Sequence, residues 1–207
     1  MFEFLRMRLA QGERTVRFPA DPTDLPERFR GRPVIRCSGN EGACDECLRR
    51  IPSRVLRNKG VALPVLDVGE CLFAPEEALE CSRGGIAFTR DYRMASSRRD
   101  ALVTPDGEIE LAVALNKKMR RLFGRSLRLR SVAAGSCNGC ESELIALGNV
   151  VFDRARLGVQ FVASPRHADG IVITGAVSLN MREALQKTYE AVPDPRLVIA
   201  VGACAIS

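Results

Sequence analysis

The sequence predicts an α/β fold, with a parallel sheet in the C-terminal half and a smaller α+β region ahead of it. Apolar, strand-like runs alternate with helix-like segments from about residue 125 onward. Such alternation favours parallel strands joined by crossover helices. Residues 1 to about 100 are instead irregular, rich in Arg, Gly and Pro. A chain of 207 residues with 46% hydrophobic content suits one large or two small domains with packed cores.

The elements of the C-terminal half can be assigned in order. Each expected strand is a short apolar run, and each expected helix shows apolar residues at helical spacing. We expect strands over residues 127–132, 159–163, 170–174 and 197–201. Helices over residues 141–150 and 181–191 would provide the crossover connections.

Two further segments lie outside these regions. Residues 2–9 form a short amphipathic stretch, which either docks on a partner or membrane surface or frays as a terminus. Residues 111–121 have helical periodicity and end in four basic side chains, as a connecting helix would. The expected organisation is therefore an arm (1–30), a cysteine-rich domain (31–105), a linker (106–125) and the α/β domain (126–207).

Charge and cysteine content restrict the function. The net charge is +6, but Lys and Arg are spread along the chain, which favours the surface of a subunit over a nucleic-acid footprint. The eight cysteines follow no signal peptide, so we expect metal binding or catalysis rather than a disulfide framework. No apolar run reaches about 18 residues, the length needed to span a bilayer.

The cysteines of the first half resemble two degenerate ferredoxin runs. A two-cluster ferredoxin repeats C-x2-C-x2-C-x3-C-P, and the fourth cysteine of each run binds the other cluster. Residues 41–52 keep the second and third positions of one run, whereas residues 71–81 keep the first and fourth positions of another. Crossed ligation then leaves three thiolates at one site, with the out-of-register Cys37 available as the fourth, and a single thiolate at the other site.

The first of these sites is expected to bind one [4Fe–4S] cluster in a ferredoxin-like α+β domain. Its ligands would be Cys37, Cys44, Cys47 and Cys81. A structural zinc site on the same four thiolates is the alternative, and absence of any metal is a third possibility. Cys71 is then a leftover buried or free thiol.

Three cysteines of the second half follow expected strands. Cys137 and Cys140 lie where the strand over 127–132 turns into a helix, and Cys204 lies just past the strand over 197–201. Thiolates on small-residue loops at strand ends can converge on one iron–sulfur cluster.

Four ordered motifs in residues 131–207 carry a family resemblance. They are GSCNGCE (135–141), ASPRHAD (163–169), VITG (172–175) and VIAVGACA (198–205). This region resembles the small subunit of group 4 [NiFe] hydrogenases and its relative, the B subunit of complex I. The resemblance implies a flavodoxin-like sheet with a [4Fe–4S] cluster at the C-terminal ends of its strands.

The resemblance also implies the ligands of this second cluster. Cys137, Cys140 and Cys204 take three ligand positions, and the separated C-x2-C favours the hydrogenase branch over complex I. The family's fourth ligand lies in a later Gly-Cys-Pro-Pro segment, which this sequence lacks. We therefore expect a partial flavodoxin-like sheet in a C-terminally truncated chain, with the second cluster present only if the fourth ligand is supplied.

Three other side chains near these motifs have alternative interpretations. His167, the single histidine, is a structural loop residue or tunes the cluster. Glu143 either joins a proton route or has no functional role. Glu141 stands in the first helical turn, where a carboxylate complements the helix dipole.

Together these patterns predict an electron-transfer subunit of a membrane-associated hydrogenase or formate hydrogenlyase-like complex. The active site would lie on a [NiFe] hydrogenase-type large subunit, with membrane subunits and other ferredoxin-like subunits as further partners and no nucleic acid. The expected location is cytoplasmic, peripheral on the inner membrane. A complex I-type quinone oxidoreductase B-like subunit and a zinc-stabilised binding module are the alternatives.

Overall fold

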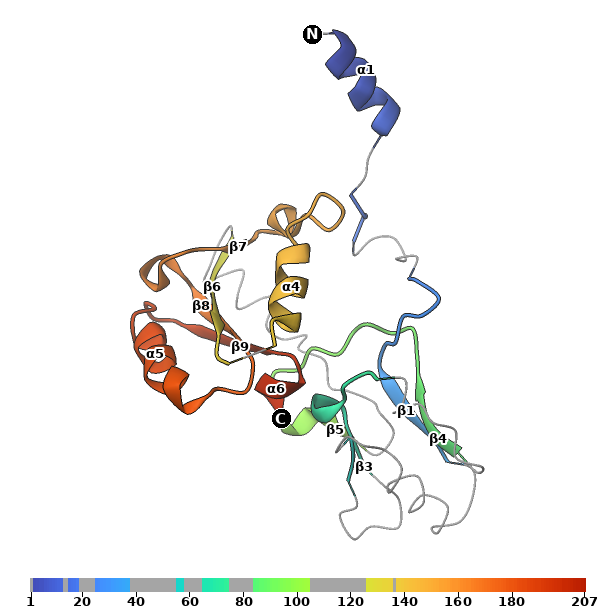
Figure 1. Ribbon diagram of the computed structural model, residues 1–207, viewed down its shortest axis with the longest axis vertical. Helices are drawn as coiled ribbons and strands as arrows, with labels where there is room; N and C mark the ends of the chain where they lie inside the picture. The colour runs from blue at the N-terminus through green and yellow to red at the C-terminus, as the bar shows by residue number, and fades with distance from the viewer. Residues whose placement is uncertain are drawn as a thin grey trace. The chain divides into compact units, whose positions relative to one another are not determined.

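The computed structural model describes residues 2–12, 15–18, 25–37, 55–57, 65–74, 84–104, 126–135 and 137–207. These residues belong to two compact units (Figure 1). The first unit comprises Met1–Asp24 and Phe123–Ile199, and the second comprises Leu25–Leu122 and Ala200–Ser207. The two units are described separately below.

A four-stranded sheet organises the first unit. Its strands are β6 (Leu127–Ala133), β7 (Val159–Phe161), β8 (Gly170–Thr174) and β9 (Leu197–Val201), in the spatial order β7-β6-β8-β9. The central strand β6 runs parallel to both β7 and β8. This order corresponds to the first four strands of the flavodoxin-like order 2-1-3-4-5. The predicted α/β class is confirmed.

Two helices cover this sheet. Helix α4 (Gly139–Ala146) connects β6 to β7, helix α5 (Leu179–Glu190) connects β8 to β9, and the two lie on opposite faces of the sheet (Figure 1). Two 3-10 turns, η4 (Arg154–Leu157) and η5 (Pro165–His167), flank β7. The connection from β6 to β7 runs in one direction across the sheet, and the connection from β8 to β9 runs in the other. Because both crossovers are right-handed, their helices lie on opposite faces.

The core of the first unit comes from both faces of its central strands. Leu129 and Val132 of β6 are buried, as are Ile171 and Val172 of β8. Val192, which follows α5, packs with Ile171 and Ala168 in one buried cluster. Because β8 lies inside the sheet, four of its five residues are buried, which explains its continuous apolar sequence.

Helix α4 is shorter than its sequence pattern predicts. It ends at Ala146 rather than near residue 150. The Asn149 side-chain oxygen accepts hydrogen bonds from the backbone N–H groups of Val151 (2.9 Å) and Phe152 (3.1 Å). An asparagine that bonds the backbone two or three residues ahead starts a new turn, and so competes with continued helix.

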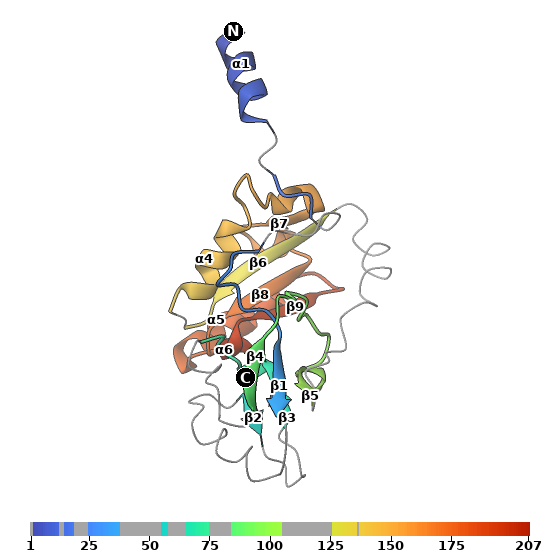
Figure 2. The ribbon, with the colours of Figure 1, turned by 90° about the vertical axis from the view of Figure 1, so that its right-hand side faces the viewer.

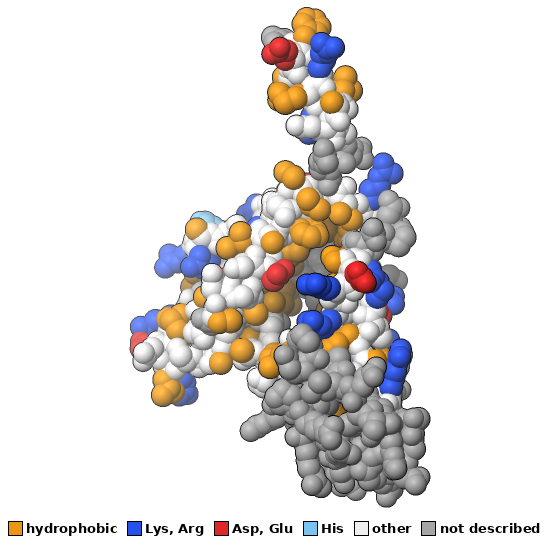
Figure 3. All heavy atoms as spheres, turned by 45° about the vertical axis from the view of Figure 1, so that its right-hand side comes forward, with side chains coloured by type: hydrophobic (Ala, Val, Ile, Leu, Met, Phe, Trp, Pro, Cys, Tyr) orange, Lys and Arg blue, Asp and Glu red, His pale blue; other side chains and the backbone are white. Residues whose placement is uncertain are grey.

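The N-terminal helix α1 (Phe2–Gln11) has no buried residue. Figure 3 shows apolar side chains around this helix next to basic and acidic ones. Beyond α1, the Thr15 hydroxyl donates to the Val150 carbonyl and the Val16 N–H donates to the Val151 carbonyl, both at 2.8 Å. The arm is therefore attached to the first unit just after its helix.

The second unit is built from short antiparallel strands. Strand β1 (Pro33–Cys37) pairs with β4 (Gly84–Phe88) (Figure 2). Strands β2 (Leu56–Arg57), β3 (Val65–Asp67) and β5 (Val103–Thr104) form a second sheet in the order β2-β3-β5. The 3-10 turns η1 (Val68–Glu70) and η3 (Asp100–Leu102) follow β3 and precede β5.

One apolar core holds this unit together. Its buried members are Val55, Leu66, Val68, Cys71, Ile86 and Leu102. Ile206, in the short C-terminal helix α6 (Ala203–Ile206), packs against the same core. Cys71 is only 2% exposed, in agreement with its expected role as a buried thiol.

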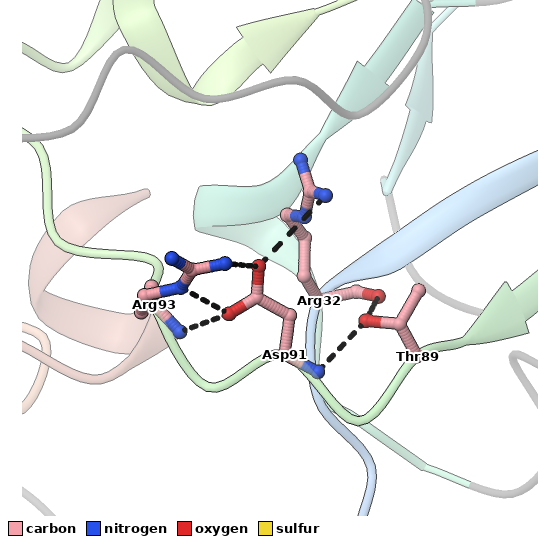
Figure 4. A network of polar contacts seen from close by, with 4 residues as sticks. All are labelled: Arg32, Thr89, Asp91 and Arg93. Atoms are coloured by element: carbon pink, nitrogen blue, oxygen red, sulfur yellow. Dashed lines mark hydrogen bonds and ion pairs between the residues drawn. The ribbon is translucent and has the colours of Figure 1, made fainter. Parts of the chain in front are cut away.

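A polar network fixes the chain after β4 (Figure 4). The Asp91 carboxylate accepts hydrogen bonds from the Arg93 backbone N–H (3.0 Å) and from Nε (2.9 Å) and Nη2 (3.1 Å) of the same residue. Arg32 Nη2 lies 3.9 Å from Asp91 Oδ2, and the Asp91 N–H donates to the Thr89 hydroxyl. The hydrogen bonds from Arg93, with a smaller contribution from Arg32, lower the pKa of Asp91 to about 2.

Several predictions fall outside the described residues. These are the connecting helix over 111–121 and the positions of Cys44, Cys47 and Cys81. Among the helices of the described ranges, none combines the length and apolar character needed to cross a membrane.

Candidate iron–sulfur site

Cys137 and Cys140 stand at the carboxyl end of β6, where the strand order reverses. From β6 the chain passes through α4 to β7 on one side, whereas β8 lies on the other side and leads through α5 to β9. In open α/β sheets, ligands bind in the crevice at such a switch point, outside the carboxyl ends of the strands. The cysteine pair therefore occupies the expected ligand position of this sheet.

The loop between β6 and α4 carries Cys137, and we call it the cysteine loop. Its first residues are held by the segment after β8. The Ala134 N–H donates to the Thr174 carbonyl (2.8 Å), and the Ser178 N–H donates to the Ala134 carbonyl (2.9 Å). Gly135 follows with a φ of 101°, and a Cβ at this position would lie 3.1 Å from the Ser178 Cβ. Glycine is required here both by the positive φ and by the close approach of Ser178.

The two thiols lie on either side of the start of α4. Asn138 adopts a left-handed conformation (φ 68°) and turns the chain into the helix at Gly139. Cys137 is exposed and Cys140 is half-buried. A Cβ on Gly139 would lie 3.6 Å from the Cys137 sulfur, so this thiol rests beside the loop backbone.

This donor set fits an iron–sulfur cluster. The pair offers two thiols on a loop of small residues, and thiolates are the ligands that such clusters use. The chemistry of these residues thus agrees with the cofactor that the sequence predicts.

Glu141 has a partner that the sequence analysis did not identify. The Thr174 hydroxyl donates a hydrogen bond to Glu141 Oε1, and it also lies 3.4 Å from the Val132 carbonyl oxygen. Thr174 is completely buried at the end of β8. The carboxylate therefore links the first turn of α4 to the central strands of the sheet, in addition to any interaction with the helix dipole.

Cys204 belongs to the second unit. It is exposed in α6, after Gly202, which has a φ of 88°. The N–H groups of Ala205 and Ile206 both donate to the Gly202 carbonyl and close the single helical turn. Cys137 and Cys140 belong to the first unit, so the grouping of all three cysteines stays a prediction.

The ferredoxin-like set also stays a prediction. Cys37 is the last residue of β1, opposite Gly84 of β4, three positions after Cys81 in the sequence. Within the described ranges, no group of three or more His, Cys, Asp or Glu side chains is arranged to hold a metal ion. His167 lies in η5 and Glu143 in α4, where its side chain is exposed.

Comparison with known proteins shows what the C-terminal region is similar to. Residues 137–207 match the family described as NADH ubiquinone oxidoreductase, 20 Kd subunit. The match begins at the first cysteine of the C-x2-C pair and includes β7, β8, β9 and Cys204.

Individual relatives describe this similarity more closely. The chain is 45% identical over 93 residues to a probable membrane-bound hydrogenase subunit, mbhJ, of Pyrococcus furiosus, covering 44% of this chain and 56% of that protein. It is 38% identical over 98 residues to formate hydrogenlyase subunit 7 of Escherichia coli (47% and 38% covered). It is 42% identical over 87 residues to the B subunit of NADH-quinone oxidoreductase from Bacteroides thetaiotaomicron (41% and 43% covered).

One solved structure gives a further match. A chain of the membrane-bound sulfane sulfur reductase, an archaeal respiratory membrane complex, is 33% identical with a TM-score of 0.34, covering 44% of this chain and 48% of that one. The predicted resemblance to group 4 hydrogenase small subunits and the complex I B subunit is confirmed by the relatives in sequence. The chain spans between 38% and 56% of the length of the three relatives named above.

Proposed function

We propose that this chain is an iron–sulfur electron-transfer subunit of a membrane-associated [NiFe] hydrogenase or formate hydrogenlyase-like complex. The observation that carries the proposal is the position of Cys137 and Cys140 at the switch point of the β7-β6-β8-β9 sheet. Both cysteines fall within the region that matches the oxidoreductase family.

In this proposal, Cys137, Cys140 and Cys204 hold one [4Fe–4S] cluster if a fourth ligand is supplied. Such a cluster supplies one-electron steps when bound. Gly135 and Asn138 shape the loop that presents the first two thiols. Burial, hydrogen bonds and nearby charge from the protein would set the potential.

A second [4Fe–4S] cluster is proposed for the ferredoxin-like region. Its ligands are Cys37, Cys44, Cys47 and Cys81. The pairing of Cys37 with Gly84 supports this set, because Gly84 follows Cys81 by only three residues in the sequence. The buried position of Cys71 in the apolar core supports its exclusion.

The proposed partners follow from the relatives. Two of them are named as subunits of a membrane-bound hydrogenase and of formate hydrogenlyase. We therefore assign the active site to a [NiFe] hydrogenase-type large subunit, with membrane subunits and other ferredoxin-like subunits completing the complex. A peripheral position on the cytoplasmic face of the inner membrane agrees with this assignment.

A complex I-type B subunit is the second candidate. The match to the B subunit of an NADH-quinone oxidoreductase supports it. The separated C-x2-C pair favours the hydrogenase class, as the sequence resemblance implies. A zinc-stabilised binding module would use the same N-terminal thiols without sulfide.

Metal and sulfide analysis of the anaerobically purified chain tests the proposal. We expect iron and acid-labile sulfide in equal amounts, with absorbance near 400 nm. With the fourth ligand supplied, Cys137→Ser and Cys140→Ser should each lower the iron content, because serine is a poor ligand for iron in such clusters. Cys71→Ala is the matched control and should retain the iron. If the purified chain contains zinc and no sulfide, the electron-transfer proposal is rejected in favour of the zinc-stabilised binding module.

A further inference from the structure

A buried carboxylate lies at the junction of β3 and η1. Asp67 ends β3, is completely buried, and accepts a hydrogen bond from the Gly69 N–H at 3.1 Å. An ionised carboxylate in such a position requires a positively charged partner or several hydrogen bonds.

Arg99 supplies the positive charge and also donates a hydrogen bond to the backbone of Ile206. Its Nη1 lies 2.8 Å from Asp67 Oδ1, and its Nη2 donates to Asp67 Oδ2 at 3.0 Å. Its Nε donates to the backbone carbonyl of Ile206 at 2.7 Å. The Nη2 hydrogen bond and the close ionic contact of Nη1 with the carboxylate orient the guanidinium, and with it the Nε–H bond.

Ile206 fits against the same turn. Its side chain packs on the core of the second unit, and Gly69 provides the necessary room. A Cβ at position 69 would lie 2.8 Å from the Ile206 Cγ2 and 3.0 Å from the Arg99 Cζ. Asp67, Gly69, Arg99 and Ile206 thus form one contact, which we call the α6 lock.

The lock holds the segment that carries Cys204. Cys204 lies two residues before Ile206 in the single turn of α6, and its own side chain is exposed. Packing of Cys204 itself therefore contributes little to its position. The hydrogen bond and the apolar contact of Ile206 supply the anchoring, together with the Gly202 carbonyl that caps the turn.

We propose that Arg99 is a positioning residue for the Cys204 ligand segment. It orders α6 through the ion pair with Asp67 and the hydrogen bond to Ile206, before any cluster is inserted. The part that concerns a cluster rests on the proposed function. Ligands held in place by surrounding hydrogen bonds bind metal centres more tightly than mobile ones.

Hydrogen exchange of the full chain without iron tests the ordering step. In Arg99→Ala, the amides of Ala205, Ile206 and Ser207 should exchange about tenfold faster, while those of α5 should stay unchanged. The matched control is Arg98→Ala, because the ion pair of Arg98 with Asp100 is exposed. Wild-type exchange at these amides in Arg99→Ala overturns the inference.

Two further variants separate the effect of side-chain geometry on α6 from the effect of charge. Arg99→Lys keeps the charge but loses the fork and the Nε donor, so we expect exchange as fast as in Arg99→Ala. Gly69→Ala keeps both charges and displaces Ile206, and should also accelerate exchange in α6. A wild-type result for Arg99→Lys would show that charge alone suffices and would contradict the proposed geometry.

Electron paramagnetic resonance of the reduced, iron-loaded chain tests the ligand step. The signal that Cys204→Ser alters should also change its g values in Arg99→Ala, whereas the signal lost in Cys44→Ser should not. Unchanged g values in Arg99→Ala reject the positioning role. If no signal of the wild type depends on Cys204 when the fourth ligand is supplied, the proposed cluster is wrong, and the exchange result still decides whether Arg99 orders α6.

Discussion

The hydroxyl of Thr174, at the end of β8, donates a hydrogen bond to the carboxylate of Glu141, one residue after Cys140. This bond joins the helix that carries one proposed cluster ligand to a strand of the sheet. Because Thr174 is completely buried, water cannot replace it as the donor without a rearrangement of the core.

Thr174→Val should destabilise the chain by about 1–3 kcal/mol, since it removes a hydrogen bond to a charged group while conserving shape. Chemical denaturation followed by circular dichroism measures the loss. Thr188→Val is the matched control, because the Thr188 hydroxyl is exposed and bonds only to its own helix. Equal losses in the two variants would show that the bond from Thr174 to Glu141 adds nothing beyond the general cost of replacing threonine by valine.

Gly135→Ala should disturb the cysteine loop. The substitution places a Cβ at a φ of 101° and 3.1 Å from the Ser178 Cβ, at a cost of about 1–3 kcal/mol. Thermal unfolding gives the change in stability, and alkylation gives the change in reactivity of Cys137. Gly12→Ala also has a positive φ but meets no atom within 4 Å, so it adds backbone strain without a clash and should leave the reactivity of Cys137 unchanged.

Cys44→Ser or Cys81→Ser should remove the ferredoxin-type cluster, lowering the iron content by about four atoms per chain. Cys71→Ser should retain that iron, although a hydroxyl in the apolar core lowers the stability. Iron and sulfide analysis after anaerobic purification provides the measurement. Equal loss of iron in Cys71→Ser and Cys44→Ser would reject the proposed ligand set.

The lowered pKa of Asp91 predicts a contribution to acid stability. This pKa falls from 3.8 to about 2 in the folded chain, so the ionised form of Asp91 stabilises the fold fully above pH 3.8. The contribution decreases as the pH falls from about 4 to about 2. We expect a loss of about 1 kcal/mol in Asp91→Asn at pH 7, because solvent screens part of the interaction.

The difference in stability between wild type and Asp91→Asn should shrink toward zero near pH 2. Urea denaturation at several pH values measures it. Asp100→Asn is the control, because the pair of Asp100 with Arg98 is solvent-exposed and should show little difference at any pH. A pH-independent deficit in Asp91→Asn would show that the carboxylate acts through packing rather than charge.

The parallel sheet could be predicted from local patterns. The bounds of β8 and β9 agree with their apolar runs, because each run ends at a glycine or at a charged residue. The end of α4 could not be predicted as well, since the Asn149 turn competes with a helical pattern that continues beyond it.

The partners of the candidate site could not be predicted from local patterns. Helix α6 and the α6 lock depend on a contact between Arg99 and Ile206, 107 residues apart in the sequence. The residues adjacent to Arg99 and to Ile206 in the sequence do not indicate this contact. The bond between Thr174 and Glu141 likewise depends on how β8 and α4 pack, which no periodicity encodes.

The bond from Thr15 to Val150 spans 135 residues and has a consequence for biosynthesis. At about 5–20 residues per second, a ribosome needs roughly 7–27 s to make the residues between these two positions. During that interval the amino-terminal arm has no place to attach, and the apolar side chains of α1 face solvent or the ribosome surface. Chaperones that recognise exposed apolar side chains therefore have time to bind this arm before the turn that anchors it exists.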